Sequence, residues 1–328
     1  MTASQGPIVG LDDAFGLRAR ALRALQGRLL ALFAEAGYDE AIPPLLDRPE
    51  TLKSGAGRFL ADQTIVFSDP AGAGLLAIRS DMTPQIARIA ATRLQHEPVL
   101  RLCYSGTVML ARPESRRGSR QQWQTGVECL GVAGGEGDAE VLELAARSMA
   151  AAGFSRPVLQ VGHVGLLRAL LTADAGDASP LEPWRDVMAR RSPEDAKAAL
   201  DTAGITGDRR RALLELASGR ADEAWLEQSL GLFGDAFDMA ARELLDLARA
   251  AARRLDGAVT VRADAAVMPR FLYHSGIVFT GFAEGVPRPL LHGGRYDAMM
   301  AAHGRDMPAT GFSCDLWSWL DAGARADG

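Results

Sequence analysis

One stretch of the sequence, residues 164–255, differs from its surroundings because it is rich in Ala, Leu, Arg and Glu and carries only helical patterns. Short apolar runs typical of strands precede it and resume after it. Strands on both sides of a helical insert can share one sheet, which is typical of an α+β fold. We therefore predict a mainly antiparallel sheet flanked by helices, built from residues 1–163 and 256–328, with residues 164–255 as a helical insertion.

The patterns before the insert predict helices, a hairpin and two long strands. Apolar residues recur at helical spacing over residues 12–37, where Gly37 is a suitable stop. Pro43 and Pro44 lie in an extended run, residues 41–46, which suits the edge of a sheet because proline cannot donate to a ladder. The other predicted elements are strands at 64–67 and 75–78, a helix at 83–93, strands at 99–108 and 123–132, a helix at 136–152 and a strand at 157–161.

The insert and the segment after it complete the prediction. Helices are predicted at 193–203, 208–216 and 235–255, strands at 258–262 and 276–282, and a last strand-and-loop unit from residue 290. A C-terminal helix contains Trp317 and Trp319, which we expect to anchor the core or an interface.

The amino-acid composition argues against several classes of protein. A chain of 328 residues with 48% hydrophobic residues can bury a sizeable core without disulfides or a structural metal. Its net charge of −5 argues against broad capture of nucleic acid, which needs a basic face. Cys103, Cys129 and Cys314 are far apart, so we expect reduced thiols, no metal site and no cofactor. The sequence has no signal-peptide layout and no apolar stretch of membrane-spanning length, so we expect a cytoplasmic protein.

Three motifs occur in a fixed order. The first reads L-A-I-R-S-D-M-T-P at 76–84, the second joins R-P at 112–113 and Arg120 to Q-T-G-V-E-C-L-G at 124–131, and the third joins G-G-R-Y-D at 293–297 to P-A-T-G-F at 308–312. A weaker fourth match reads Y-H-S-G-I-V-F at 273–279. In this order the motifs resemble the class II aminoacyl-tRNA synthetases, and specifically histidyl-tRNA synthetase. The resemblance spans residues 10–320 and implies a class II synthetase-like core.

The departures from that family concern the groups that handle ATP. Where the family holds the α-phosphate with an arginine and has an acid shortly after it, this chain has Met109 and Ala111. The third motif ends in D-L-W-S at 315–318, without the family's arginine, and the catalytic arginine falls at Pro269 or, with a shift of one residue, Arg270. Adenylate formation depends on positive groups at developing phosphate charge, so we expect no catalytic residues here. The chain ends soon after the third motif, and we also expect no anticodon-binding domain.

The residues of the family's amino-acid pocket are better preserved. The resemblance implies a site for a histidine-like ligand made of Asp81, Thr83, Arg112, Gln124, Glu128 and Tyr273. Carboxylates and a side-chain carbonyl accept hydrogen bonds from an ammonium, and Arg112 can bind a carboxylate with two parallel bonds. His274 replaces the family's second tyrosine. Because unpaired buried polar groups cost on the order of 1–3 kcal/mol each, we expect a ligand or ordered water to satisfy them.

A synthetase core without its ATP-binding residues resembles one family in particular, the regulatory subunits of short-form ATP phosphoribosyltransferase. The D-M-T-P-Q-I-A-R signature of that family stands at 81–88. The resemblance implies a non-catalytic subunit that activates a short catalytic subunit, usually within a hetero-octamer, in the first step of histidine biosynthesis. It also implies a part in feedback inhibition by histidine, and a self-dimer through the region between Asp12 and Leu46, the family's first motif.

Each candidate residue also has a structural interpretation. Asp81 and Thr83 suit a helix N-cap. Gln124 and Glu128, which share one face of a predicted strand, suit a structural hydrogen-bond network. The arginine-rich loop at 112–120 suits a solvated surface, or a contact with an acidic partner or phosphate. Two other functions stay open: a residual amino-acid-activating enzyme, and a paralogue that binds a tRNA-like RNA.

Overall fold

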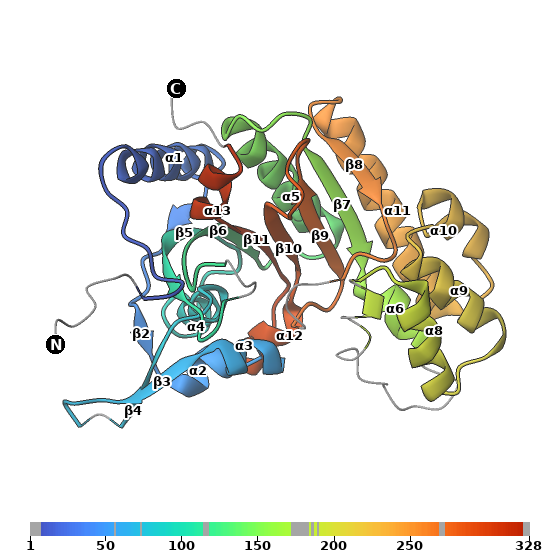
Figure 1. Cartoon of the computed structure of the whole chain (residues 1–328), viewed down its shortest axis with the longest axis horizontal. Coiled ribbons are helices and arrows are strands. Elements are labelled where there is room, and N and C mark those ends of the chain that lie inside the picture. The colour runs from blue at the N-terminus through green and yellow to red at the C-terminus, as the bar shows by residue number, and fades with distance from the viewer. Residues whose placement is uncertain are drawn as a thin grey trace.

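The computed structural model describes residues 8–55, 57–72, 74–113, 118–171, 184, 187–188, 190–268 and 273–323. Its main strands are β1 (Asp39–Glu40), β5 (Leu100–Met109), β6 (Gln121–Leu130), β7 (Val158–His163), β8 (Thr260–Ala263), β9 (Ile277–Phe282), β10 (Leu291–Arg295) and β11 (Ala309–Asp315). They form one eight-stranded sheet in the order β1-β5-β6-β11-β10-β9-β7-β8 (Figure 1). Only the outermost pairs, β1 with β5 and β7 with β8, are parallel. The predicted α+β fold with a mainly antiparallel sheet is confirmed.

Helices cover both faces of this sheet, with a core under each layer. One layer consists of α1 (Gly16–Glu35), α5 (Gly135–Ala151), α11 (Asp235–Leu255) and α13 (Leu316–Asp321), and the other contains α4 (Thr83–Thr92) and α12 (Asp297–Ala302). Alternation along β6 shows the division, because Val127 and Cys129 join the larger core whereas Leu130 joins the smaller one. Gln124 and Glu128 lie on the Leu130 face of β6, toward α4.

A three-stranded sheet protrudes from the body of the molecule (Figure 1). It contains β2 (Leu46–Asp47), β3 (Ile65–Ser68) and β4 (Leu75–Ile78) in the antiparallel order β2-β4-β3, and α2 (Pro49–Lys53) and α3 (Gly57–Gln63) connect its strands. The predicted hairpin is therefore confirmed. One face of this sheet is apolar and carries Leu46, Ile65, Phe67, Leu76 and Ile78. These side chains are half-buried or exposed, and none packs against a core within the described residues.

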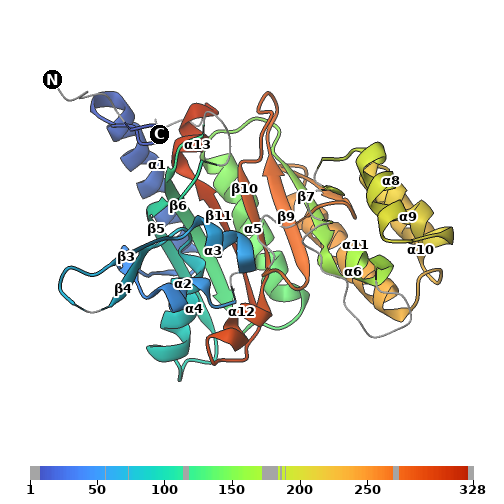
Figure 2. The same ribbon diagram turned by 60° about the horizontal axis from the view of Figure 1, so that its bottom comes forward.

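The predicted insertion contains only helices in its described part. They are α6 (Val164–Leu171), α8 (Pro193–Thr202), α9 (Gly207–Ala217), α10 (Glu223–Ser229) and α11. Figure 2 shows α8, α9 and α10 grouped beside α6 and α11, at the β8 end of the sheet. Ser192 accepts a hydrogen bond from the backbone N–H of Asp195, and Pro193 is the first helical residue, which explains where α8 begins. The domain boundaries at 163/164 and 255/256 stay a prediction.

The structure departs from the predicted elements at several places, including the helices α2, α3 and α12, which were not predicted. Pro43 and Pro44 lie between β1 and β2 and belong to neither strand, because they cannot donate to a ladder. The sequence did not reveal β11 as a strand, since its first half is buried on both faces and Gly311 breaks the alternation of polar and apolar residues. Met82, not Asp81, is the N-cap of α4, although Asp81 accepts the backbone N–H of Thr83 at 3.3 Å.

Candidate functional site: a buried cluster of acids and hydroxyls

The candidate site is a polar cluster buried where β6, β5 and the turn before α4 meet. It consists of Asp81, Thr83, Tyr104, Gln124, Glu128, Tyr273 and Tyr296, all of them buried. Gln124 and Glu128 point to the same side of β6 because they are four residues apart on a strand. The sequence placed five of these residues in one site, and the structure brings those five together.

Glu128 is the centre of the cluster and is only 2% exposed. Its Oε1 accepts hydrogen bonds from Oγ1 of Thr83 at 2.8 Å and from the hydroxyl of Tyr104 at 3.0 Å, and its Oε2 accepts one from the hydroxyl of Tyr296 at 2.6 Å. Gly311 on β11 leaves space for the carboxyl group, since a Cβ atom there would lie 1.8 Å from Oε2. Neutral hydroxyl groups therefore hold the Glu128 carboxyl.

Asp81 is joined to the cluster through Gln124. The amide Nε2 of Gln124 donates to Oδ1 of Asp81 at 2.6 Å, and its Oε1 accepts the backbone N–H of Met82 at 2.9 Å. Oδ2 of Asp81 accepts a weak hydrogen bond from the hydroxyl of Tyr273 at 3.4 Å. Gln124 therefore fixes the turn before α4 through both a side chain and the backbone.

The cluster is acidic and buried. Desolvation raises the pKa of Glu128 from 4.5 to about 8, the nearby Asp81 carboxyl adds to the rise, and the hydroxyl donors oppose it. Within the described residues no basic side chain forms an ion pair with Glu128 or Asp81. Buried charge without a partner is costly in a protein interior. A ligand ammonium would correct this imbalance, because it favours the ionised carboxylate.

The polar atoms of the cluster satisfy one another, which corrects the expectation that a ligand or water must do so. The buried side-chain atoms that lack a hydrogen-bond partner in the described chain lie elsewhere, on Gln85, Asp138, Ser275, His303 and Thr310. The hydroxyl groups of Tyr104, Tyr273 and Tyr296 supply hydrogen bonds to the two acids, and the sequence did not indicate Tyr104 and Tyr296. Tyr104 pairs with Gly126 on β6, and Tyr296 belongs to the G-G-R-Y-D motif, so register and motif together could have indicated both.

Arg112, which the sequence assigned to the same site, does not join the cluster. Its side chain is exposed and lines a separate cavity of about 760 Å³ near α13 and the start of α1. Ser313 also lines that cavity, and its hydroxyl accepts a hydrogen bond from Nε2 of Gln124 at 3.2 Å, so the cavity adjoins the cluster. Residues 114–117 of the arginine-rich loop, and Pro269 and Arg270, lie outside the described residues.

The positions at which the synthetases bind ATP phosphates lie around this cavity and the end of β5. Met109 ends β5, Ala111 follows it, and neither side chain can donate to a phosphate. Asp315 accepts the backbone N–H of Trp123 at 2.9 Å and the hydroxyl of Ser318 at 2.7 Å, so it ties β6 to α13. Burial raises the pKa of Asp315. An acid bonded in this way anchors the helix and repels a phosphate.

Similarity to known proteins identifies the family to which the chain belongs. A sequence profile of histidyl-tRNA synthetase matches residues 10–318. The ATP phosphoribosyltransferase regulatory subunit of Burkholderia mallei (strain SAVP1) is 38% identical over 306 residues, which are 93% of this chain and 79% of that protein. The chain belongs to the ATP phosphoribosyltransferase regulatory subunit family.

Solved structures place the ATP phosphoribosyltransferase regulatory subunit family on the synthetase fold. A protein from Bacillus halodurans, described as an ATP phosphoribosyltransferase regulatory subunit/histidyl-tRNA synthetase, superposes with a TM-score of 0.85 at 25% identity, covering 97% of this chain and 83% of that one. A chain of the HisG:HisZ complex of ATP phosphoribosyl transferase from Thermotoga maritima gives a TM-score of 0.66 at 18% identity, covering 93% and 98%. At that identity the likeness shows the fold alone. The predicted synthetase-like core is thus confirmed.

The described residues contain neither a metal-ligand cluster nor a helix suited to span a membrane. In the described part of the chain, no three or more His, Cys, Asp or Glu side chains are arranged to hold a metal ion. Among the same residues, no helix combines the length and apolar character that a membrane span requires. Cys103, Cys129 and Cys314 are buried and free.

Proposed function

We propose that this chain is the non-catalytic regulatory subunit of a two-subunit ATP phosphoribosyltransferase, and that it activates the short catalytic subunit in the first step of histidine biosynthesis. The observation that carries this proposal is the 38% identity, over 93% of the chain, to a protein named as such a regulatory subunit. We further propose that the assembly is a cytoplasmic hetero-octamer inhibited by histidine.

The 760 Å³ cavity supports a non-catalytic role. Arg18 in its wall pairs with Asp321 at 2.9 Å, and Arg288 donates to the backbone carbonyl of Ser318 at 2.8 Å. Two of its cations therefore have protein partners, and Asp315 adds negative charge close by. Phosphoryl and adenylyl transfer need free positive groups on the phosphates. Among the described residues Arg112 is the third arginine of the wall, so one exposed cation is left where ATP phosphates would need several.

Activity measurements test the proposed role directly. The chain alone should show no ATP phosphoribosyltransferase activity, and the short catalytic subunit should gain activity when the chain is added. A catalytic subunit that does not respond would overturn the proposal. Two further assays address the alternatives: ATP–pyrophosphate exchange with histidine should stay at background, and a low-salt filter-binding assay should detect no tRNA. The mass of the mixed complex in solution tests the hetero-octamer.

We propose that the acid cluster binds the ammonium group of histidine. Glu128 and Asp81 are two buried carboxyl groups, and no cation among the described residues pairs with them. A ligand ammonium would stabilise their ionised forms. Arg112 is exposed beside the adjoining cavity, and we propose that it binds the ligand carboxylate after the loop moves. The loop movement is needed because Arg112 makes no contact with the cluster in this structure.

Glu128→Ala should weaken histidine inhibition of the assembled enzyme by roughly 5- to 150-fold, the usual range of coupling between sites. Glu136→Ala is the matched control because Glu136 is exposed on α5 and should leave inhibition unchanged. Basal activation should be retained in both variants. Inhibition curves that are the same for Glu128→Ala and the wild type would place the inhibitor elsewhere.

We also propose a homodimer through the region between Asp12 and Leu46. Phe15 and Ile42 each expose 82% of their surface, and Leu46 lies on the apolar face of the small sheet. Exposed apolar side chains of this kind are typical of an interface. Sedimentation should show a dimer, and Ile65→Asp on the apolar face should give monomers. Ser68→Asp, on the opposite face, is the control and should stay dimeric. A monomeric wild type at micromolar concentration would contradict this assignment.

A further inference from the structure

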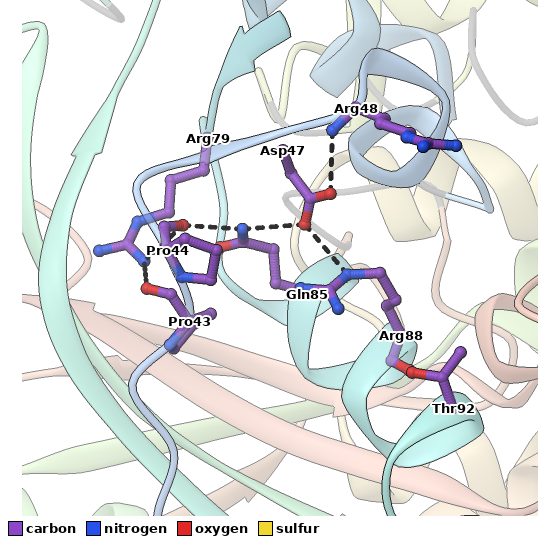
Figure 3. A network of polar contacts seen from close by, with 8 residues as sticks. All are labelled: Pro43, Pro44, Asp47, Arg48, Arg79, Gln85, Arg88 and Thr92. Carbon is purple, nitrogen blue, oxygen red and sulfur yellow. Dashed lines mark hydrogen bonds and ion pairs between the residues drawn. The ribbon is translucent and has the colours of Figure 1, made fainter. Parts of the chain in front are cut away.

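The segment between β1 and β2 faces two environments. Ile42 and Leu45 expose 82% and 47% of their surface, whereas the carbonyl groups of Pro43 and Pro44 accept hydrogen bonds from buried side chains (Figure 3). The prolines have no N–H group and the segment belongs to no strand, so its carbonyl groups need side-chain donors. We refer to this segment together with β2, residues 41–47, as the strap.

Arg79 holds the strap from one side. Its buried guanidinium donates through Nη1 to the carbonyl of Pro43 and through Nε to the carbonyl of Thr107 on β5, both at 2.8 Å. Its backbone N–H donates to the carbonyl of Leu45 at 3.2 Å. Gly106 leaves room for this group, since a Cβ atom there would lie 2.7 Å from Nη2. Within the described residues no carboxylate pairs with Arg79, so its planar group acts as a fixed donor between carbonyls.

Gln85 and Arg88 hold the strap from α4. The side chain of Gln85 is fully buried, and its Nε2 donates to the carbonyl of Pro44 at 2.9 Å and to Oδ2 of Asp47 at 3.1 Å. Arg88, almost one turn further along α4, donates through Nε to the same oxygen at 3.0 Å. Figure 3 shows these side chains converging on the strap from the strand before the turn and from the helix after it.

The turn that carries Asp81 and Thr83 lies between Arg79 and Gln85 in the sequence. A displacement of the strap must therefore move the ends of this turn or break buried hydrogen bonds. We propose that Arg79 and Gln85 are positioning residues that couple the exposed strap to the acid cluster. A subunit that contacts the strap then changes how the cluster binds its ligand, and the ligand changes the strap equally, because coupling is reciprocal. The ligand-dependent part of this inference rests on the proposed histidine site.

Amide hydrogen exchange at residues 45–48 of the full chain tests the coupling. Histidine should slow exchange there in the wild type. In Gln85→Ala this slowing should disappear, and histidine affinity measured by calorimetry should fall by roughly 5-fold or more. Gln95→Ala is the matched control, because Gln95 is an exposed residue that hydrogen-bonds only to its neighbour His96. It should behave as the wild type does.

A second pair of variants keeps the test independent of the ligand. Glu128→Gln changes the cluster from within and should alter exchange at residues 45–48, but not when it is combined with Gln85→Ala. Arg79→Lys keeps a charged donor and loses the planar group, so it should fold cooperatively and still lose the coupling.

The outcomes separate the two proposals. If histidine does not bind the wild type, the ligand site is wrong, and the Glu128→Gln comparison alone decides the coupling. If histidine binds Gln85→Ala as tightly as the wild type and the strap responds to neither histidine nor Glu128→Gln, the coupling is wrong and the ligand site stands.

Discussion

Two buried carboxyl centres lie on the strands that flank β11, on opposite faces of the sheet, and are built in opposite ways. At β10 the guanidinium of Arg295 pairs with Asp138 at 2.9 Å and donates to the carbonyl of Gly134 at 2.8 Å. At β6 Glu128 and Asp81 have only hydroxyl and amide donors within the described residues. Among the described residues the first centre contains a cation, and the second does not.

This difference indicates what each centre is for. Asp138 has a cation of the protein as its partner, and the Asp138–Arg295 pair links α5 to β10. A buried pair of acids without a cation is poorly explained by stability, because burial disfavours the ionised form. This is why we propose that an external cation completes the second centre. Substitutions that alter one centre at a time, each with a substitution at a matched site as its control, test this difference.

The largest effect is expected for Arg295→Met. It leaves Asp138 buried and unpaired, and breaking a buried pair in this way typically costs about 3–5 kcal/mol. Urea unfolding at pH 7 measures the loss of the free energy of unfolding. Arg156→Met is the control, because its pair with Glu284 is largely exposed and should contribute about 0–1 kcal/mol. Equal losses in the two variants would remove the distinction between the buried pair and a surface pair.

The second effect is the pH dependence of stability that Glu128 causes. Its pKa is about 8 in the folded protein against 4.5 for the ordinary side chain. Between these values the folded state holds a proton that the unfolded state has lost, so the stability falls as the pH rises from 5 to 8. Each pH unit is worth about 1.4 kcal/mol, which gives a fall of about 2–4 kcal/mol.

Glu128→Gln should remove this part of the slope, because an amide does not titrate. Urea unfolding at several pH values between 5 and 8 compares the slopes of variant and wild type. Glu136→Gln, at an exposed position on α5, should keep the wild-type slope. Parallel stability curves for Glu128→Gln and the wild type would show that the buried carboxyl does not take up a proton in this range.

How much of the two centres could be predicted from sequence depends on the kind of contact. The period of two along a strand placed Gln124 and Glu128 on one face, and the motif order brought Asp81 and Thr83 to them. Neither rule shows which side chain from a distant segment fills the remaining space. Tyr104, Tyr296 and the Asp138–Arg295 pair all depend on the register between strands and helices far apart in the chain.

The sequence also did not show which of the candidate side chains are exposed. Arg112 adjoins the second motif in sequence, yet it lies outside the cluster because the strand ends at Met109 and the chain turns away. The prolines at 43 and 44 indicated the edge of a sheet, whereas they lie between β1 and β2. The hydrogen bonds from Arg79 and Gln85 to their carbonyl groups cannot be read from periodicity.

Gly311→Ala should have the third effect in size. The added Cβ atom would lie 1.8 Å from Oε2 of Glu128 and 2.4 Å from the carbonyl of Val127, so the Glu128 carboxyl must leave its position. Overpacking of this kind costs about 1–3 kcal/mol. Histidine binding, measured by calorimetry, should fall together with stability. Gly135→Ala on α5 is the control because its Cβ atom would enter open space, and it should change neither quantity.

The smallest expected effect is that of Tyr104→Phe, which removes one of the three hydroxyl donors to Glu128. Oε1 of Glu128 keeps the hydrogen bond from Thr83, so the stability should fall by only about 0.5–1.5 kcal/mol. The informative measurement is the titration of the Glu128 carboxyl by carbon NMR. The Tyr104 hydroxyl lowers the pKa of Glu128, so its removal should move the midpoint to higher pH.

Tyr38→Phe is the matched control for this last measurement. The Tyr38 hydroxyl donates to Glu140 at 2.7 Å, and that carboxylate also pairs with Arg101 at 2.7 Å, so it belongs to a charge-balanced centre like the one at β10. The midpoint for Glu128 should not move in Tyr38→Phe. A shift of the Glu128 midpoint in both variants, or in neither, would mean that the hydroxyl groups do not set the protonation of the acid cluster. The difference in protonation between the acid cluster and the paired carboxylates would then have another cause.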